Sequence, residues 1–171
     1  GEAALVREGE HVTVVALARM VVFAEKAIDS VVKDGITCDL IDPRTTSPLD
    51  IDTILESIEN TGRLVIVDES PPRCSVASDI AGQVASRGFR SLKAPVQIVT
   101  APHSPVPFAR ELERLFEAAR RRRHHGHFAR GRIDFHDETM RTRIGAKNYF
   151  DGLAVDLQKC APDMAHGFAF F

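Results

Sequence analysis

The sequence predicts an α/β domain, with a mostly parallel β-sheet that carries helices on both of its faces. Short apolar runs rich in β-branched residues recur along the chain, and stretches with the period of an α-helix separate them. This alternation is typical of parallel sheets, because each parallel connection needs a crossover that a helix can supply. We expect the crossovers to be right-handed.

The first third of the chain predicts two strands and one helix. The run Val-Thr-Val-Val-Ala-Leu-Ala at 12–18 predicts a strand buried on both faces. A helix is predicted over 20–34, where Gly35 ends it, and a second strand over 37–41. The apolar face of that helix consists of Met20, Ala24, Ala27, Ile28, Val31 and Val32.

Two further helices and two strands follow in the same alternation. Asp50 is placed to cap a helix that Gly62 ends, and a strand is predicted over 64–68. The next helix runs from about Ser75 to Gly88, before a strand over 96–100. A last helix is predicted to carry Leu112, Leu115 and Phe116 on one face.

The carboxyl ends of the predicted strands gather charge and proline. Functional loops of parallel sheets meet at this edge. The loops here contribute Arg19, Asp42, Arg44, Asp68, Glu69, Arg73 and His103. We therefore expect any functional surface of the domain at this edge.

Composition excludes several classes of protein. The 171 residues suit one domain plus an extension, and a net charge of −2 predicts no general attraction to nucleic acid or to a membrane. No apolar run reaches the roughly 20 residues that a membrane span needs. Three widely separated cysteines argue against a disulfide scaffold and fit a reducing compartment. The abrupt start at Gly1, without a signal peptide, is what an excised domain would show.

Catalytic and cofactor-binding motifs are missing from the sequence. It contains no GxGxxG, GxxxxGK[ST], GxSxG or HExxH pattern. The acid pairs Asp50/Asp52 and Asp68/Glu69 are better explained by a helix cap and a strand-end loop than by an acid–base couple. Cys74 precedes a helix, which can lower a thiol pKa, but no base stands beside it in the sequence, so we interpret it as a bystander.

Five segments, taken together and in order, resemble a known family. They are Arg-Glu-Gly at 7–9, Ala-Arg-Met-Val at 18–21, Ile-Asp-Pro-Arg-Thr-Thr-Ser-Pro-Leu-Asp at 41–50, Val-Asp-Glu-Ser-Pro-Pro-Arg-Cys at 67–74 and Val-Thr-Ala-Pro-His-Ser-Pro-Val-Pro-Phe at 99–108. This set closely resembles the C-terminal, transketolase-like domain of the β subunits of pyruvate, branched-chain and acetoin dehydrogenases. The resemblance implies a three-layer α/β/α domain over residues 1–118 with a five-stranded mixed sheet. Its first strand, 3–7, would run antiparallel to the rest.

The resemblance also implies a role in a larger enzyme, an oxidoreductase. Such an enzyme is an α2β2 heterotetramer that uses thiamine diphosphate and magnesium to decarboxylate a 2-oxoacid, or to cleave acetoin, and passes the acyl group to lipoyl-lysine. In this family the cofactors sit on the α subunit, and the activating glutamate sits on the N-terminal domain of the β subunit. We therefore expect no catalytic, cofactor-binding or metal-binding residue in this chain, and no activity from the chain alone.

The implied task of the domain is assembly. Its partners would be the α subunit, a second β subunit and the small binding domain of the acyltransferase core, in the bacterial cytoplasm or the mitochondrial matrix. The resemblance assigns interface positions to Arg44, Glu69 and Arg73, although either arginine is equally explained by hydrogen bonds within its own loop. His103 is a candidate contact, but a solvated loop histidine is the commoner case. Lys93 stands where many relatives have aspartate, which reverses the charge offered to a partner.

The extension at 119–171 departs from the family. Residues 120–132 are rich in arginine and histidine and contain no acid, and the residues after them lack any sustained period. RNA or DNA binding is one hypothesis. It is weakened because Phe128 is the only aromatic residue within the basic run. A metal site at His124, His125, His127 and His136 is another. A disordered or unselected extension is the interpretation that we favour.

Two alternatives for the whole chain remain. A transketolase or deoxyxylulose-phosphate synthase would share the domain but would need a phosphate-binding cluster at the strand ends. A free-standing module with a basic nucleic-acid-binding tail would show RNA binding that depends on salt.

Overall fold

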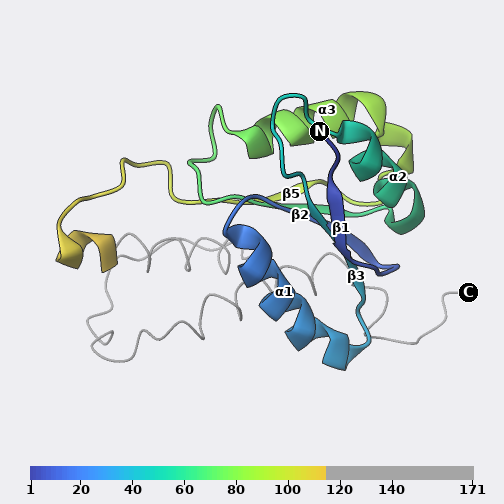
Figure 1. Cartoon of the computed structure of the whole chain (residues 1–171), viewed down its shortest axis with the longest axis horizontal. Coiled ribbons are helices and arrows are strands. Elements are labelled where there is room, and N and C mark those ends of the chain that lie inside the picture. The colour runs from blue at the N-terminus through green and yellow to red at the C-terminus, as the bar shows by residue number, and fades with distance from the viewer. Residues whose placement is uncertain (115–171) are drawn as a thin grey trace, which may run out of the picture.

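The computed structural model describes residues 1–114, which Figure 1 draws as a ribbon. Five strands form one sheet in the order β1-β3-β2-β4-β5. Their bounds are Ala4–Arg7 (β1), Val12–Ala16 (β2), Cys38–Asp42 (β3), Leu64–Val67 (β4) and Gln97–Val99 (β5). Strand β1 pairs antiparallel with β3, and the other three pairs are parallel. The predicted mixed sheet and its antiparallel first strand are confirmed. The predicted extension at 119–171 lies outside the described residues.

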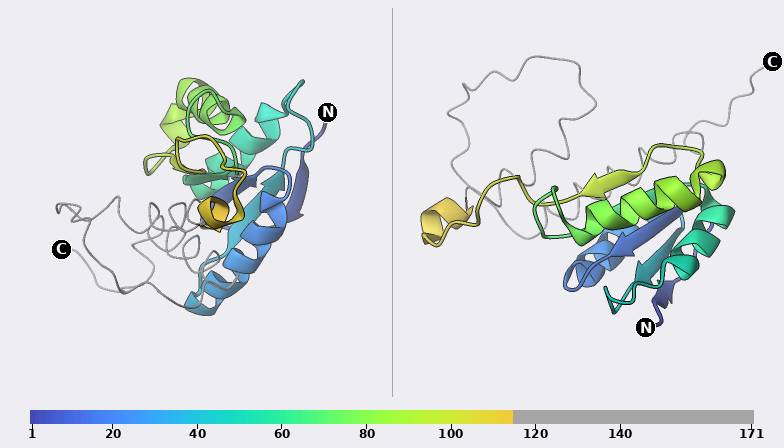
Figure 2. Two further views of the ribbon diagram at one scale, coloured as in Figure 1. Left: turned by 90° about the vertical axis from the view of Figure 1, so that its left-hand side faces the viewer. Right: turned by 90° about the horizontal axis from the view of Figure 1, so that it is seen from above.

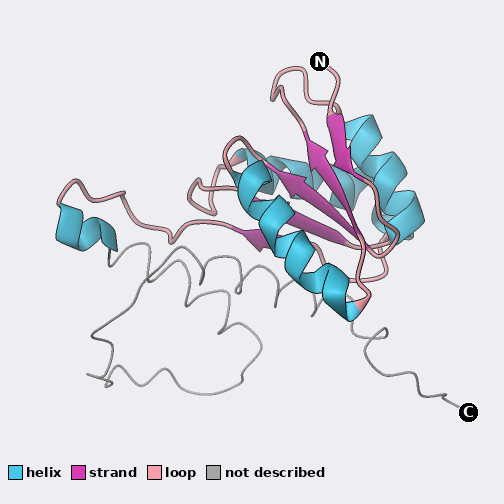
Figure 3. Cartoon of the chain, turned by 60° about the horizontal axis from the view of Figure 1, so that its bottom comes forward, coloured by secondary structure: helices cyan, strands magenta, loops and turns pink. Residues whose placement is uncertain are grey.

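Helices cover both faces of the sheet. Helix α1 (Met20–Val31) lies on one face, and α2 (Ile51–Thr61) and α3 (Val76–Arg87) lie on the other, as Figures 2 and 3 show. Because successive strand residues point to opposite faces, Val14 packs with the α1 layer and Val15 with the α2/α3 layer. All five residues of β2 are buried, as expected for a central strand. The predicted three-layer architecture is confirmed.

The end of α1 differs from the prediction. The α-helix stops at Val31, and residues Val32–Asp34 continue as a 3₁₀ turn before Gly35, whose φ of 80° lies in the left-handed region. Val32 was expected on the buried face, yet it is 38% exposed. The tighter 3₁₀ turn rotates its side chain out of the row that faces the sheet.

Asp50 caps α2 and also fastens the first strand. Its carboxylate accepts hydrogen bonds from the Thr53 backbone N–H (3.2 Å), the Thr53 hydroxyl (2.8 Å) and the Ala3 backbone N–H (2.9 Å). The hydrogen bond from Ala3, followed by those from Thr53, lowers the pKa of Asp50 below its usual 3.8.

We expect Asp50→Ala to lower the free energy of unfolding by about 1 kcal/mol at neutral pH. Because folding lowers this pKa, the stabilisation is present above 3.8 and is lost as the pH falls through the lowered value. Urea unfolding of both proteins, at neutral pH and in acid, checks this. The difference between them should shrink in acid, and a constant difference would contradict the assignment.

A buried polar network joins α2 to the sheet, and it was not predicted. The Thr13 hydroxyl lies 2.6 Å from the Ser57 hydroxyl and 2.7 Å from that of Thr61. Ser57 donates to Asp39 (2.5 Å), whose other oxygen accepts from the Gly9 backbone N–H (2.8 Å). The network thereby fixes the turn between β1 and β2 to β3 and α2.

Candidate functional site

The loops that follow β2, β3 and β4 meet at the carboxyl edge of the sheet. They line a pocket of about 450 Å³ with residues 17–18, residues 42–46, Asp68, Ser70 and Val76. The connections diverge here, because the β2–α1 connection leads to one face of the sheet and the β4–α3 connection to the other. Crevices at such points are the usual binding places of open α/β sheets.

The backbone of these loops takes an uncommon form. Ala18, Arg44 and Cys74 all have a left-handed conformation, with φ of 51°, 58° and 53°. Non-glycine residues adopt it at a cost of about 1 kcal/mol or more, so surrounding contacts must maintain it. At Arg44 that contact is visible, since its backbone N–H donates to the Asp42 carboxylate at 3.0 Å.

Asp68 is the buried charge of the pocket. It is 6% exposed, and its Oδ1 accepts a hydrogen bond from the Ser70 backbone N–H at 3.1 Å. Its Oδ2 is buried and has no hydrogen-bond partner in the part of the chain that the structure describes. The next residue, Glu69, is exposed and lies 4.0 Å from Arg19, which in turn stacks over the Phe23 ring at 5.4 Å.

The predicted interface residues fall at two ends of the sheet. Arg44, Glu69, Arg73 and His103 are exposed on the loops at the carboxyl edge. Lys93 instead precedes β5, and its backbone N–H donates to Gly62 O (2.7 Å) just before β4 begins. Any partner that contacts Lys93 therefore meets a different surface from one that contacts Arg44.

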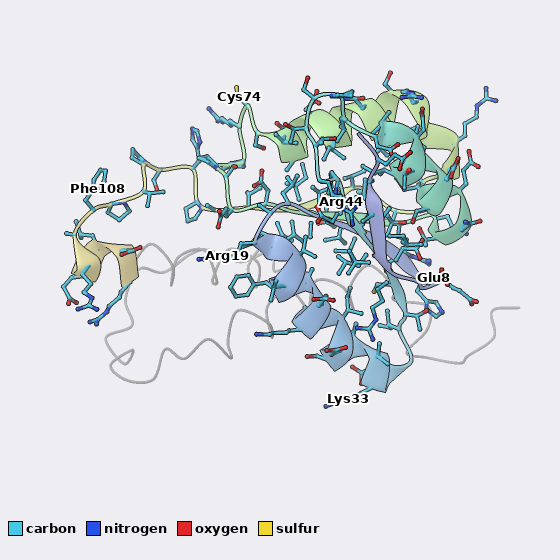
Figure 4. All side chains as sticks on the ribbon, in the orientation of Figure 1. Glu8, Arg19, Lys33, Arg44, Cys74 and Phe108 are labelled. Carbon is cyan, nitrogen blue, oxygen red and sulfur yellow. The ribbon has the colours of Figure 1, made fainter. Side chains whose placement is uncertain are left out.

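The other candidate groups are placed as follows. Cys74 is exposed on the loop before α3 (Figure 4). Within residues 1–114 no three His, Cys, Asp or Glu side chains lie together as a metal site would need, and no helix is long and apolar enough to cross a bilayer. The basic run at 120–132 and the histidines His124, His125, His127 and His136 lie outside the described residues.

An exposed apolar arm follows β5, and sequence reasoning gave a partner role on it to His103 but to none of its apolar side chains. The chain leaves the sheet after residue 100 and reaches away from it, as Figures 1 and 4 show. Phe108 is fully exposed on this arm, Val106 is 60% exposed and Leu112 is 53% exposed. The expected final helix begins at Arg110, while Leu115 and Phe116 lie beyond the described residues. Three prolines in six residues, at 102, 105 and 107, are the signal that this segment stays extended.

Comparisons with known proteins agree with this fold. The family model for the C-terminal domain of transketolase matches residues 1–121. A solved split-gene transketolase, described as an inactive β4 tetramer, superposes with a TM-score of 0.63 at 18% identity, over 94% of this chain and 42% of that one. At that identity the superposition supports the fold alone.

Sequence relatives are more specific. The β subunit of acetoin:2,6-dichlorophenolindophenol oxidoreductase from Cupriavidus necator is 52% identical over 68% of this chain and 34% of its own length. The Bacillus subtilis protein of the same name is 49% identical, over 66% and 33%. The β subunit of the pyruvate dehydrogenase E1 component of B. subtilis is 40% identical, over 64% and 34%. The chain thus spans about a third of the length of these relatives, and it belongs to the family of transketolase C-terminal domains.

Proposed function

We propose that this chain is the assembly and partner-docking domain of the β subunit of a thiamine-diphosphate-dependent dehydrogenase that acts on acetoin or a 2-oxoacid. The observation that most supports this proposal is the 52% identity to an acetoin oxidoreductase β subunit. The partners would be an α subunit, a second β subunit and the binding domain of an acyltransferase core. Such an enzyme would work in the bacterial cytoplasm or the mitochondrial matrix, and residues 119–171 would lie outside the domain proper.

The carboxyl edge and the arm support an assembly role. Arg44, Glu69 and Arg73 offer charge and His103 offers an imidazole on exposed loops, and the arm beside them offers large apolar side chains. An exposed phenylalanine on an extended segment buries apolar area when a partner covers it, and aromatic and arginine side chains dominate many interfaces. Lys93, at the other edge, would contact the binding domain of the acyltransferase core, which is not part of the complex between α and β subunits.

Residues 1–114 supply no site that fits thiamine diphosphate with magnesium. The sequence has no glycine-rich turn placed to hold a diphosphate, and residues 1–114 hold no cluster of metal-ligating side chains. The proposal therefore assigns the cofactors and the catalytic groups to other parts of the enzyme. The part played by the domain is to position those parts.

We expect the chain to form a stable complex when it is mixed with an α subunit and the N-terminal part of a related β subunit, such as those of the C. necator relative. Phe108→Ser should weaken that complex by about tenfold or more, because a buried interface phenylalanine contributes about 1.4 kcal/mol or more. Sedimentation velocity at a series of concentrations measures both effects.

Phe89→Ser is the matched control, because Phe89 is 72% exposed but lies after α3, near Lys93. It should leave that complex unchanged. Equal weakening by both substitutions would contradict the role of the arm, and the absence of any complex would contradict the proposed function.

A further inference from the structure

We propose that the apolar arm of one copy of this chain, residues 101–114, docks into an apolar groove on a second copy. The groove lies between α3 and the residues that lead into β5. The inference goes beyond the proposed function, because it concerns the chain in the absence of any other subunit. It gives the unassembled chain a partner that covers its exposed apolar side chains.

The groove is open, and its walls are mostly apolar. It has a volume of about 690 Å³. Its apolar lining includes Ala81, Gly82, Ala85, Phe89, Pro95 and Val96. Phe89 is 72% exposed, and a Cβ atom built at Gly82 would meet nothing within 4 Å, so this lining is uncovered in the part of the chain that the structure describes. An exposed apolar surface of this kind gains free energy when a partner covers it.

The arm does not reach the groove of its own copy. It leaves the sheet at the carboxyl end of β5 and extends away from the domain, as Figures 1 and 4 show. The groove lies at the opposite end of that strand, because its lining ends at Val96 and β5 begins at Gln97. The two surfaces are therefore both exposed on one molecule, and in this arrangement they can meet only between two molecules.

The arm has the features that such a groove selects. Prolines at 102, 105 and 107 hold it extended, so it loses little conformational entropy when it docks. Proline-rich extended segments commonly bind grooves lined by aromatic side chains, and Phe89 supplies such a side chain here. Val106, Phe108 and Leu112 are the large apolar side chains that the arm can bury there.

Charge favours the same pairing. Lys93 is the one charged residue of the groove lining. Its backbone N–H donates to Gly62 O, and a Cβ atom built at Gly62 would lie 2.5 Å from Lys93 Cδ, so its stem rests against the end of α2. On the arm, Arg114 pairs with Glu111 at 3.2 Å, and Glu113 follows the exposed Leu112. An acid next to an apolar anchor complements a lysine at the edge of an apolar groove.

Paired substitutions in the full 171-residue chain test this contact. Phe108→Ser damages the arm, Phe89→Ser damages the groove, and each should weaken self-association by about tenfold or more. Both side chains are exposed, so neither substitution should unfold the domain. An equimolar mixture of the two variants should form a heterodimer, because one variant supplies an intact groove and the other an intact arm. Sedimentation velocity at concentrations up to about 500 µM measures the mass in each sample.

Val22→Ser is the matched control, because Val22 is 51% exposed on α1, which covers the other face of the sheet. It should associate like the wild type. Lys93→Glu should weaken the association, since it places an acid where the arm brings Glu113, and an unchanged or stronger association would overturn the proposal.

Three further results would also overturn the proposal. The first is a wild-type chain that stays monomeric at the highest concentration. The second is full association of either phenylalanine variant alone, which would indicate an arm–arm or a groove–groove contact. The third is a mixture of the two variants that stays monomeric, because an arm that docks in a groove must be restored by mixing.

Discussion

Replacing Asp39 with alanine should lower the free energy of unfolding by about 3 kcal/mol. Asp39 is 8% exposed and accepts two hydrogen bonds from distant parts of the chain, the Gly9 backbone N–H and the Ser57 hydroxyl. Alanine leaves both donors without this acceptor and opens a gap between β3 and α2. Chemical denaturation at neutral pH measures the loss.

Asp29→Ala is the control for this substitution. Asp29 is an exposed aspartate that pairs with Arg7 at 2.6 Å on the surface. Surface pairs contribute little, so its removal should cost about 0.5 kcal/mol or less. Comparable losses from the two substitutions would mean that the buried network around Asp39 contributes no more than a surface ion pair.

The second large effect is expected at Gly9, in the turn between β1 and β2. A Cβ atom built there would lie 2.2 Å from the backbone nitrogen of Cys38 and 2.4 Å from its carbonyl carbon. Those atoms belong to β3 and cannot rotate away as a flexible side chain does. Gly9→Ala should therefore destabilise the domain by about 2 kcal/mol or more, measured by denaturation.

Gly82 offers a control of opposite sign. It lies within α3, and a Cβ atom there would meet nothing within 4 Å. Gly82→Ala should raise stability by up to about 1 kcal/mol, because alanine favours a helix more than glycine does.

Since Gly9 also donates to Asp39, the double substitution at 9 and 39 should cost less than the sum of the single ones. Strict additivity would contradict the shared hydrogen bond.

Sequence patterns predicted the three layers because each strand and helix depends on features of its own stretch of sequence. Runs of β-branched residues identified the strands. Asp50 caps α2 as expected, and Ser75, at the expected start of α3, caps that helix. Gly62 ends α2 with a φ of 74° that suits glycine. The predicted ends of the strands were less accurate. The run 12–18 was predicted as one strand, but β2 stops at Ala16 and the apolar Leu17 and Ala18 turn to line the pocket.

The polar interior could not be predicted in the same way. Thr13 lies in an apolar run, where a threonine is indistinguishable from any β-branched strand residue. Its partners Ser57 and Thr61 are 44 and 48 residues away, so only the packing of α2 on β2 brings them together. The spacing of Ser57 and Thr61 on one helical face, otherwise apolar, is the one local sign of a polar partner.

The sequence predicted that a functional surface would lie at the carboxyl edge of the sheet, but it did not predict the pocket there. Strand direction alone places Asp42, Arg44, Asp68 and Glu69 at the carboxyl ends. The same reasoning would have placed Lys93 at the opposite edge of the sheet, because Lys93 precedes β5. That Asp68 has one oxygen satisfied and the other not depends on the turn at Ser70, which composition cannot reveal.

The most direct test of the proposal that this domain assembles the enzyme, while other parts bind the cofactor, is calorimetry with thiamine diphosphate and magnesium. The cofactor is added to the purified 171-residue chain alone, and then to the chain with its α subunit and the N-terminal part of the β subunit. We predict no binding and no turnover of acetoin or a 2-oxoacid by the chain alone, and both in the complex. Tight cofactor binding with turnover by the isolated chain would contradict a domain that assembles an enzyme without taking part in its chemistry.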